Sequence, residues 1–121
     1  MAVLSSVATA LIALLHVYIL YLQMFLWTTP RGRKTFKTTL EYAEGTRVLA
    51  ANQGLYNGLL AAGLIWGLIH PFDLFGREIQ LFFLGAITVV GLYGGATAAR
   101  KIWVVQMLPA MIAFGIVYQE L

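Results

Sequence analysis

The sequence predicts an all-α integral membrane protein, folded as a bundle of four transmembrane helices. Of its 121 residues, 60% are hydrophobic and 11% are charged, whereas soluble domains carry about 25% charged residues. The apolar residues also form four runs separated by polar turns, each long enough for a hydrocarbon core of about 30 Å. We expect one domain, residues 1–121, with spans at about residues 3–27, 48–69, 79–98 and 102–118.

The first span carries its polar residues on one side. At about 100° per residue, one narrow stripe holds Ser5, Thr9, Ala13, His16, Leu20, Gln23 and Trp27. A helix surrounded by lipid has no reason to align its polar groups, so we expect this stripe to face protein. Trp27 suits the membrane interface, and Pro30 is expected to end the helix shortly afterwards. No basic residue precedes the span, so no cleavable signal peptide is expected.

The connection between the first two spans is the longest polar segment, and its basic residues are Arg31, Arg33, Lys34 and Lys37. Phe36, Leu40 and Ala43 recur within it at helical spacing. This spacing suits a short amphipathic helix lying in the membrane interface. A solvated basic loop that only fixes the topology explains the same residues, and both interpretations stay open.

The second span is distinctive because its first ten residues include several hydrogen-bonding side chains, Asn52, Gln53, Tyr56 and Asn57. Side-chain amides are costly in hydrocarbon unless they have partners, so this helix must face protein or water at that depth. Glycines at G-x-x-x-G spacing, which permit close helix contact in lipid, are Gly54 and Gly58, Gly63 and Gly67, and Gly91 and Gly95.

The remaining connections are short, and their charges predict the topology. A turn at His70–Asp73 precedes the third span, and Pro109 is expected to kink the fourth. The loop through Arg47 holds five of the eight basic residues, the turn at residues 100–101 holds two, and Arg77 lies on the other side. The positive-inside rule then places both basic loops in the cytoplasm and both termini outside.

With this topology, all four spans place hydrogen-bonding groups in the cytoplasmic half of the bilayer. The candidate binding residues are His16, Gln23, Asn52, Gln53, Tyr56, Asn57, Tyr93 and Gln106, and the candidate rim for an anionic group is Arg47, Arg100 and Lys101. One interpretation is a network that holds the helices in register, with each amide worth roughly 0.6 to 2 kcal/mol. The other is a pocket, open to the cytoplasm, that binds a small amphipathic molecule.

The titratable residues exclude several chemistries. There are no cysteines, and we expect no Asp or Glu inside any span, Glu78 being placed at a boundary. No metal site is predicted, and a proton-coupled pump lacks its usual embedded carboxylate. His16 suits either a hydrogen-bonded core residue or an acid–base group, with Tyr56 or Tyr93 as proton donor in an enzyme. The basic residues lie at a membrane surface, which gives nucleic-acid binding no support.

Four stretches resemble a known family. HVYILYLQMFLW (residues 16–27), NQGLYNGLLAAGL (52–64), FFLGAITVVGLYGGAT (82–97) and VQMLPA (105–110) resemble the small bacterial integral membrane family catalogued as domain of unknown function 1304. An acidic residue is common in that family where this chain has Gln23. The resemblance implies a multi-pass protein of the bacterial inner membrane, without an established activity.

A looser similarity is to the membrane-associated eicosanoid and glutathione metabolism family. Arg47, Ala51 and Asn52 look similar to the start of its second span, although Leu55 stands where that family has Glu. The similarity implies a homo-oligomer, a trimer, with glutathione or another thiol as a ligand, whereas a small four-span exporter would be a dimer. Besides a binding protein or enzyme for an amphipathic molecule, a small four-span transporter and a structural or assembly subunit remain alternatives.

Overall fold

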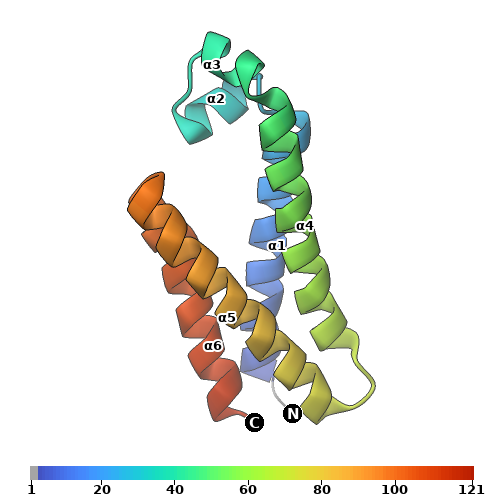
Figure 1. The fold of residues 1–121 in the computed structure, drawn as a ribbon. Coiled ribbons are helices and arrows are strands. Elements are labelled where there is room, and N and C mark those ends of the chain that lie inside the picture. The colour runs from blue at the N-terminus through green and yellow to red at the C-terminus, as the bar shows by residue number, and fades with distance from the viewer. Residues whose placement is uncertain (1–2) are drawn as a thin grey trace. The chain divides into compact units, whose positions relative to one another are not determined.

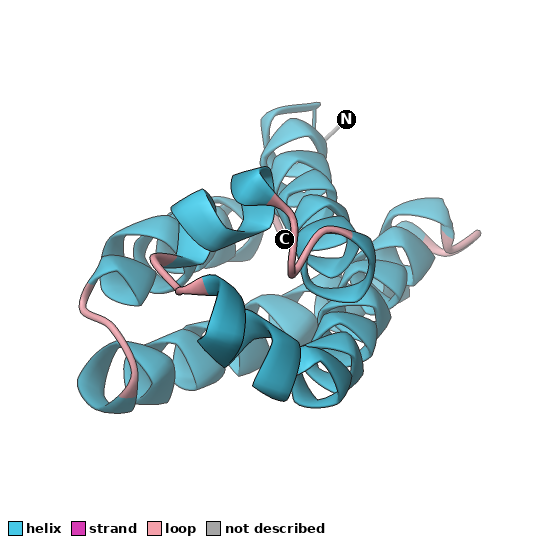
Figure 2. Cartoon of the chain, turned by 90° about the horizontal axis from the view of Figure 1, so that it is seen from above, coloured by secondary structure: helices cyan, strands magenta, loops and turns pink. Residues whose placement is uncertain are grey.

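The computed structural model describes residues 3–121, which form helices joined by short turns (Figures 1 and 2). The elements in chain order are α1 (Val3–Phe25), α2 (Pro30–Phe36), α3 (Leu40–Gly45), α4 (Arg47–Ile69), α5 (Asp73–Thr97), a π-helical turn η1 (Trp103–Met107) and α6 (Leu108–Gln119). No strand occurs within these residues. The predicted all-α class is therefore confirmed.

Several of these helices are compatible with a membrane protein. Within residues 3–121, α1, α4 and α5 are long and apolar enough to cross a bilayer. Trp103–Gln119 is a shorter apolar helix, near the lower limit for a span. Three of the four predicted spans thus have the required length and composition, while the fourth span and the orientation of the termini stay predictions.

The contacts of the chain divide it into two compact units. Leu14–Ala61 forms the first, here called the hairpin unit, which contains the end of α1, helices α2 and α3, and the start of α4. The second, here called the four-helix unit, comprises residues 3–13 and 62–121. It contains the start of α1, the end of α4, and all of α5, η1 and α6.

In the hairpin unit, α1 and α4 lie side by side (Figure 1) because small residues line their contact. Gly54 is buried, and a Cβ atom there would lie 2.7 Å from Met24 Cγ and 3.2 Å from the Leu20 carbonyl oxygen. Ala50 and Ala61 are also buried on this face of α4. The close helix contact predicted from the glycine spacing is confirmed here.

Helices α2 and α3 form one end of the hairpin unit, where the sequence left open a short amphipathic helix or a solvated loop. Pro30 begins α2 with Thr29 as its N-cap, since the fixed φ of proline suits a first helical turn. Lys37 then adopts a left-handed conformation with φ 56° and ends α2. Thr39 caps a new helix, and its side chain accepts a hydrogen bond from the Tyr42 N–H at 3.1 Å.

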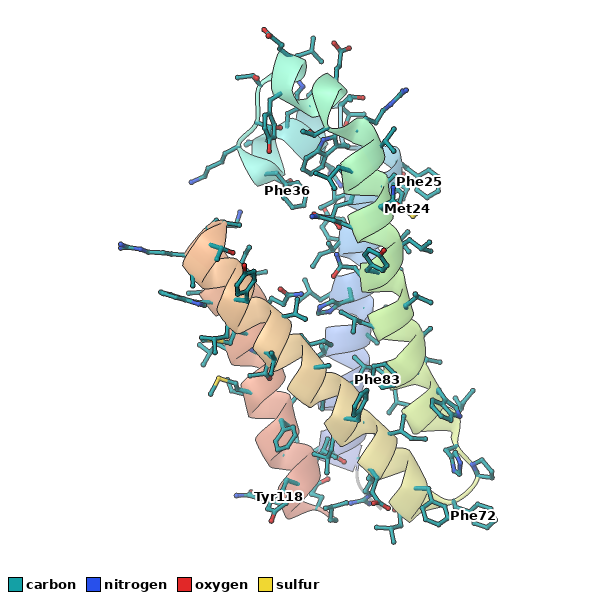
Figure 3. The ribbon with its side chains drawn as sticks, in the orientation of Figure 1. Met24, Phe25, Phe36, Phe72, Phe83 and Tyr118 are labelled. Carbon is teal, nitrogen blue, oxygen red and sulfur yellow. The ribbon has the colours of Figure 1, made fainter. Side chains whose placement is uncertain are left out.

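In the four-helix unit, one face of α5 is buried along its whole length: Gly76, Arg77, Gln80, Leu84, Ile87, Gly91 and Gly95. Gly63 of α4 packs against the ring of Phe83, which Figure 3 labels on α5. A Cβ atom on Gly91 would lie 2.9 Å from the Met107 backbone nitrogen. The glycines thus allow close contacts between α4 and α5 and between α5 and η1.

Helix α5 begins at Asp73, six residues before the predicted start at Ile79. A carboxylate in the first turn of a helix is stabilised by the positive end of the helix dipole. Asp73 also forms an ion pair with Arg77, one turn later, with 3.0 Å between Asp73 Oδ2 and Arg77 Nε. Asp73 and Glu78 therefore lie inside α5, in its first two turns. The helix is thus longer than the predicted span, because charged residues can begin a helix without interrupting it, and the absence of carboxylates from the membrane-embedded part stays a prediction.

Before Pro109, where a kink was predicted, the chain forms the π-helical turn η1, which immediately precedes α6. The Leu108 N–H donates to the Trp103 carbonyl oxygen, five residues back. Proline has no N–H to donate and its ring clashes with the carbonyl four residues before it. The wider turn accommodates both effects.

Candidate functional site

The polar stripe predicted on α1 is buried. Ser5, Thr9, Ala13, His16 and Gln23 are each at most 7% exposed. Within the hairpin unit, Asn57 Nδ2 donates a hydrogen bond to Gln23 Oε1 at 2.8 Å, joining α4 to α1. The same nitrogen also donates to the Gln53 carbonyl oxygen at 3.1 Å. Two of the predicted residues thus form a direct amide pair between two helices.

This pair, Gln23 with Asn57, keeps unused hydrogen-bonding capacity. Both hydrogens of the Asn57 amide are engaged, but its side-chain oxygen accepts no hydrogen bond from the described residues. The Gln23 amide nitrogen likewise donates none to them. Two N–H donors and one carbonyl acceptor therefore remain side by side, and an incoming polar group would find both kinds of partner.

The other predicted residues of α4 do not join this pair. Asn52, Gln53 and Tyr56 are exposed, and Asn52 Nδ2 donates to the Val48 carbonyl oxygen of its own helix at 2.8 Å. Asn52 lies five residues before Asn57, about 7.5 Å along the helix axis, while Gln23 lies two residues before the end of α1. The first turns of α4 thus extend past the end of α1, where α2 and α3 lie. Asn52 therefore forms no hydrogen bond with Gln23, and its part in a common binding site stays a prediction.

The remaining predicted site residues are distributed between the two units. Arg47 is exposed at the first position of α4, in the hairpin unit, where His16 is fully buried. Tyr93, Arg100, Lys101 and Gln106 all belong to the four-helix unit. Tyr93 is 72% exposed, both basic residues are exposed, and Gln106 is half-buried in η1. That these residues take part in one site with the amide pair stays a prediction.

A second polar cluster, which was not predicted, is buried in the four-helix unit. Thr9 Oγ1 donates to Gln80 Oε1 at 2.8 Å, and Gln80 Nε2 donates to the Gly67 carbonyl oxygen at 3.2 Å. Gln80 is 5% exposed and Thr9 is fully buried. These bonds connect α1, α5 and α4. Each polar atom engaged in them has its partner inside the unit, so the cluster serves packing rather than ligand binding.

The sequence did contain a signal for Gln80. It lies four, seven and eleven residues before Leu84, Ile87 and Gly91, which is the spacing of one helical face. The predicted span began at Ile79, so Gln80 was its second residue, and no role was assigned to it. Among residues 3–121, no three His, Cys, Asp or Glu side chains come together as a metal-binding group.

The fold and the buried amides define the class of protein: an all-helical chain with several helices compatible with a membrane protein. The sequence profile of the proteins of unknown function DUF1304 matches residues 10–118, and the chain belongs to this family. This confirms the resemblance found in its motifs. An uncharacterized protein, YpaA, from Lactococcus lactis subsp. lactis (strain IL1403) is 35% identical over 115 residues, covering 93% of this chain and 95% of the relative. No solved structure matches.

Proposed function

We propose that the protein is an integral membrane protein that binds a small amphipathic molecule, with the polar end of that molecule at the pair of Gln23 and Asn57. The supporting observation is the unused capacity of this pair, two N–H donors beside one carbonyl acceptor. In hydrocarbon such groups are unfavourable without partners. A bound polar group supplies those partners.

The geometry of the pair favours a particular ligand chemistry. A hydroxyl, a primary amide or a protonated carboxyl group can accept from Gln23 and donate to Asn57 at the same time. An isolated carboxylate cannot donate and would leave the Asn57 oxygen without a partner. Arg47 lies ten residues from Asn57 along α4, about 15 Å, so it suits an anionic group at the far end of a longer ligand.

The proposal includes the location and assembly expected from the sequence. The basic connection containing α2 and α3 would face the cytoplasm, with the chain in the bacterial inner membrane and both termini outside. Homo-oligomers, dimers or trimers, would surround the site with further helices. The mass of the gently solubilised protein tests this last point, and a monomeric mass would remove it.

The experiment measures thermal unfolding of the purified protein with and without compounds from a fixed panel: long-chain alcohols, monoacylglycerols, fatty amides, quinones and thiols. A ligand present at about 100 times its Kd stabilises a one-site protein by about 2.7 kcal/mol. We expect at least one hydroxyl or amide compound to raise the unfolding temperature of the wild type. Asn57→Leu should abolish this rise, because it removes the acceptor and breaks the pair.

Asn52→Leu is the matched control, since it removes an amide from the same helix that bonds only to its own backbone. It should leave the ligand-dependent rise intact. If no panel compound stabilises the wild type, or if both variants lose the rise equally, the binding site is not at the pair. The pair would then act only in helix packing.

A further inference from the structure

The junction between α2 and α3 contains an open surface depression, here called the cavity, that the proposed binding function does not use. Its volume is about 490 Å³, and its lining residues are Lys37, Thr38, Thr39 and Tyr42. All four belong to one short stretch of the hairpin unit. Their side chains carry one ammonium group and three hydroxyl groups, an arrangement rich in hydrogen-bond donors.

The backbone at this junction is held in an uncommon conformation. Lys37 has φ 56° and ψ 48°, and its N–H donates to the Arg33 carbonyl oxygen. Only a small fraction of residues other than glycine adopt positive φ, and such residues concentrate at ligand-binding and functional sites. The bend turns the chain between α2 and α3 and places Lys37 beside Thr38 at the cavity.

The hydroxyl of Thr38 is an unsatisfied polar group at this cavity. Its Oγ1 atom is buried and has no hydrogen-bond partner among the described residues. A threonine side chain can exchange the positions of its hydroxyl and methyl groups by rotation about χ1. Rotation toward the cavity would satisfy the hydroxyl if an acceptor were bound there. A ligand that accepts this hydrogen bond therefore removes the free-energy cost of leaving the Thr38 hydroxyl buried without a partner.

Lys37 is the one charged residue that lines the cavity, and the net charge of the surrounding segment favours an anionic acceptor. Between residues 30 and 47 the chain has five basic and two acidic residues, an excess of three positive charges, which equals the net charge of the whole chain. Leu40 is 47% exposed and Tyr42 is 58% exposed beside these charges. Exposed apolar side chains next to basic ones are typical of segments that lie in a lipid interface. Phe36, labelled in Figure 3 at the end of α2, packs against Trp27 with ring centroids 4.9 Å apart and connects this segment to α1.

We propose that this cavity binds the phosphate group of a membrane phospholipid. The Lys37 ammonium group supplies the opposite charge, and the hydroxyls of Thr38 and Tyr42 donate to the phosphate oxygens. The rings and methyl groups at its edge contact the glycerol and acyl region. Phosphate is favoured over a carboxylate because its several oxygens can accept from more of these donors. This site is independent of the pair formed by Gln23 and Asn57.

The experiment measures lipid binding to the full chain by native mass spectrometry and by thermal stabilisation in detergent. Phosphatidylglycerol is compared with diacylglycerol of the same acyl chains, which lacks phosphate, and with inorganic phosphate and glycerol phosphate, which lack acyl chains. We expect saturable binding of phosphatidylglycerol, and binding of the other three that is at least about tenfold weaker. Thr38→Val should weaken phosphatidylglycerol binding by about fivefold without lowering the stability of the lipid-free protein, because the lost hydroxyl had no partner.

Two control variants separate this site from general attraction to a basic surface. Thr35→Val removes a hydroxyl that donates to the Arg31 carbonyl oxygen of α2, and Lys34→Gln removes one exposed charge outside the cavity. Lys37→Gln should weaken binding more than Lys34→Gln does, and Thr35→Val should leave it unchanged. Equal effects of the two lysine variants, or unchanged binding in Thr38→Val, would overturn the proposal. Equally tight binding of inorganic phosphate would show a site for soluble phosphate and overturn the assignment to lipid.

Discussion

Substitution of Gly67 by alanine tests whether close backbone contact holds the four-helix unit together. A Cβ atom at Gly67 would lie 2.7 Å from Gln80 Cγ, 2.8 Å from the Gly76 carbonyl oxygen and 3.1 Å from the Gln80 backbone nitrogen. Two of these three atoms belong to the backbone of α5 and cannot move aside without displacing that helix. The added methyl group must therefore separate α4 from α5.

The expected magnitude combines three effects. Overpacking of this kind lowers the free energy of unfolding by about 1–3 kcal/mol. Separation of the helices also weakens the hydrogen bond from Gln80 Nε2 to the Gly67 carbonyl oxygen, a further loss of about 1 kcal/mol. Alanine gains up to about 1 kcal/mol of helix propensity over glycine. The net expectation for Gly67→Ala is a loss of about 1–3 kcal/mol.

Gly115→Ala is the matched control, because it lies in a helix and a Cβ atom there would have no neighbour within 4 Å. It should raise the free energy of unfolding by up to about 1 kcal/mol, through propensity alone. Both variants are measured by reversible denaturation with sodium dodecyl sulfate in mixed micelles, followed by circular dichroism. If Gly67→Ala proves as stable as Gly115→Ala, the contact between α4 and α5 is not as close as described and the reasoning fails.

Two further predictions concern the buried polar cluster and the topology. Thr9→Val should lower the free energy of unfolding by about 1 kcal/mol, since it leaves Gln80 Oε1 buried without its donor. The control is Thr88→Val, which removes a hydroxyl that bonds only to its own helix and should change the free energy of unfolding by less than about 0.5 kcal/mol. Equal losses in the two variants would contradict the role assigned to Thr9. Because the chain has no cysteine, Lys34→Cys and Phe72→Cys each introduce a single thiol, and intact cells with either variant are treated with a membrane-impermeant maleimide. We expect labelling of Phe72→Cys alone, and the reverse pattern would invert the proposed topology.

Helical periodicity in the sequence correctly predicted which residues of a helix are buried, where the buried residues recur along one face. The stripe on α1 was identified correctly because residues at 100° intervals must share an environment, whatever the neighbouring helix is. Gln23 was correctly placed among residues that need a partner. Its partner Asn57 was in the predicted set, but the sequence could not distinguish it from Asn52. That distinction depends on where α1 ends relative to α4, which is a property of the packed hairpin unit.

The elements that sequence patterns missed depend on local conformations with weak sequence signals. Lysine is a good helix former, so nothing predicts that Lys37 adopts positive φ and separates α2 from α3. The start of α5 was misplaced because Asp73, Arg77 and Glu78 lower the hydropathy of its first turns. Hydropathy locates the part of a helix that suits lipid, whereas capping and ion pairs decide where the helix begins.

The π-helical turn before α6 has a consequence for how the length of this segment can vary. A π turn contains one residue more than the α-helical turn that it replaces, so deletion of one residue within Trp103–Met107 would restore α-helical geometry there. The ring of Pro109 would then meet the carbonyl of the preceding turn. A chain shortened by that residue should therefore tolerate the deletion only when the proline is replaced as well. The extra residue of the π turn and Pro109 are therefore coupled: the extra residue makes room for the proline, and replacement of the proline allows the residue to be deleted.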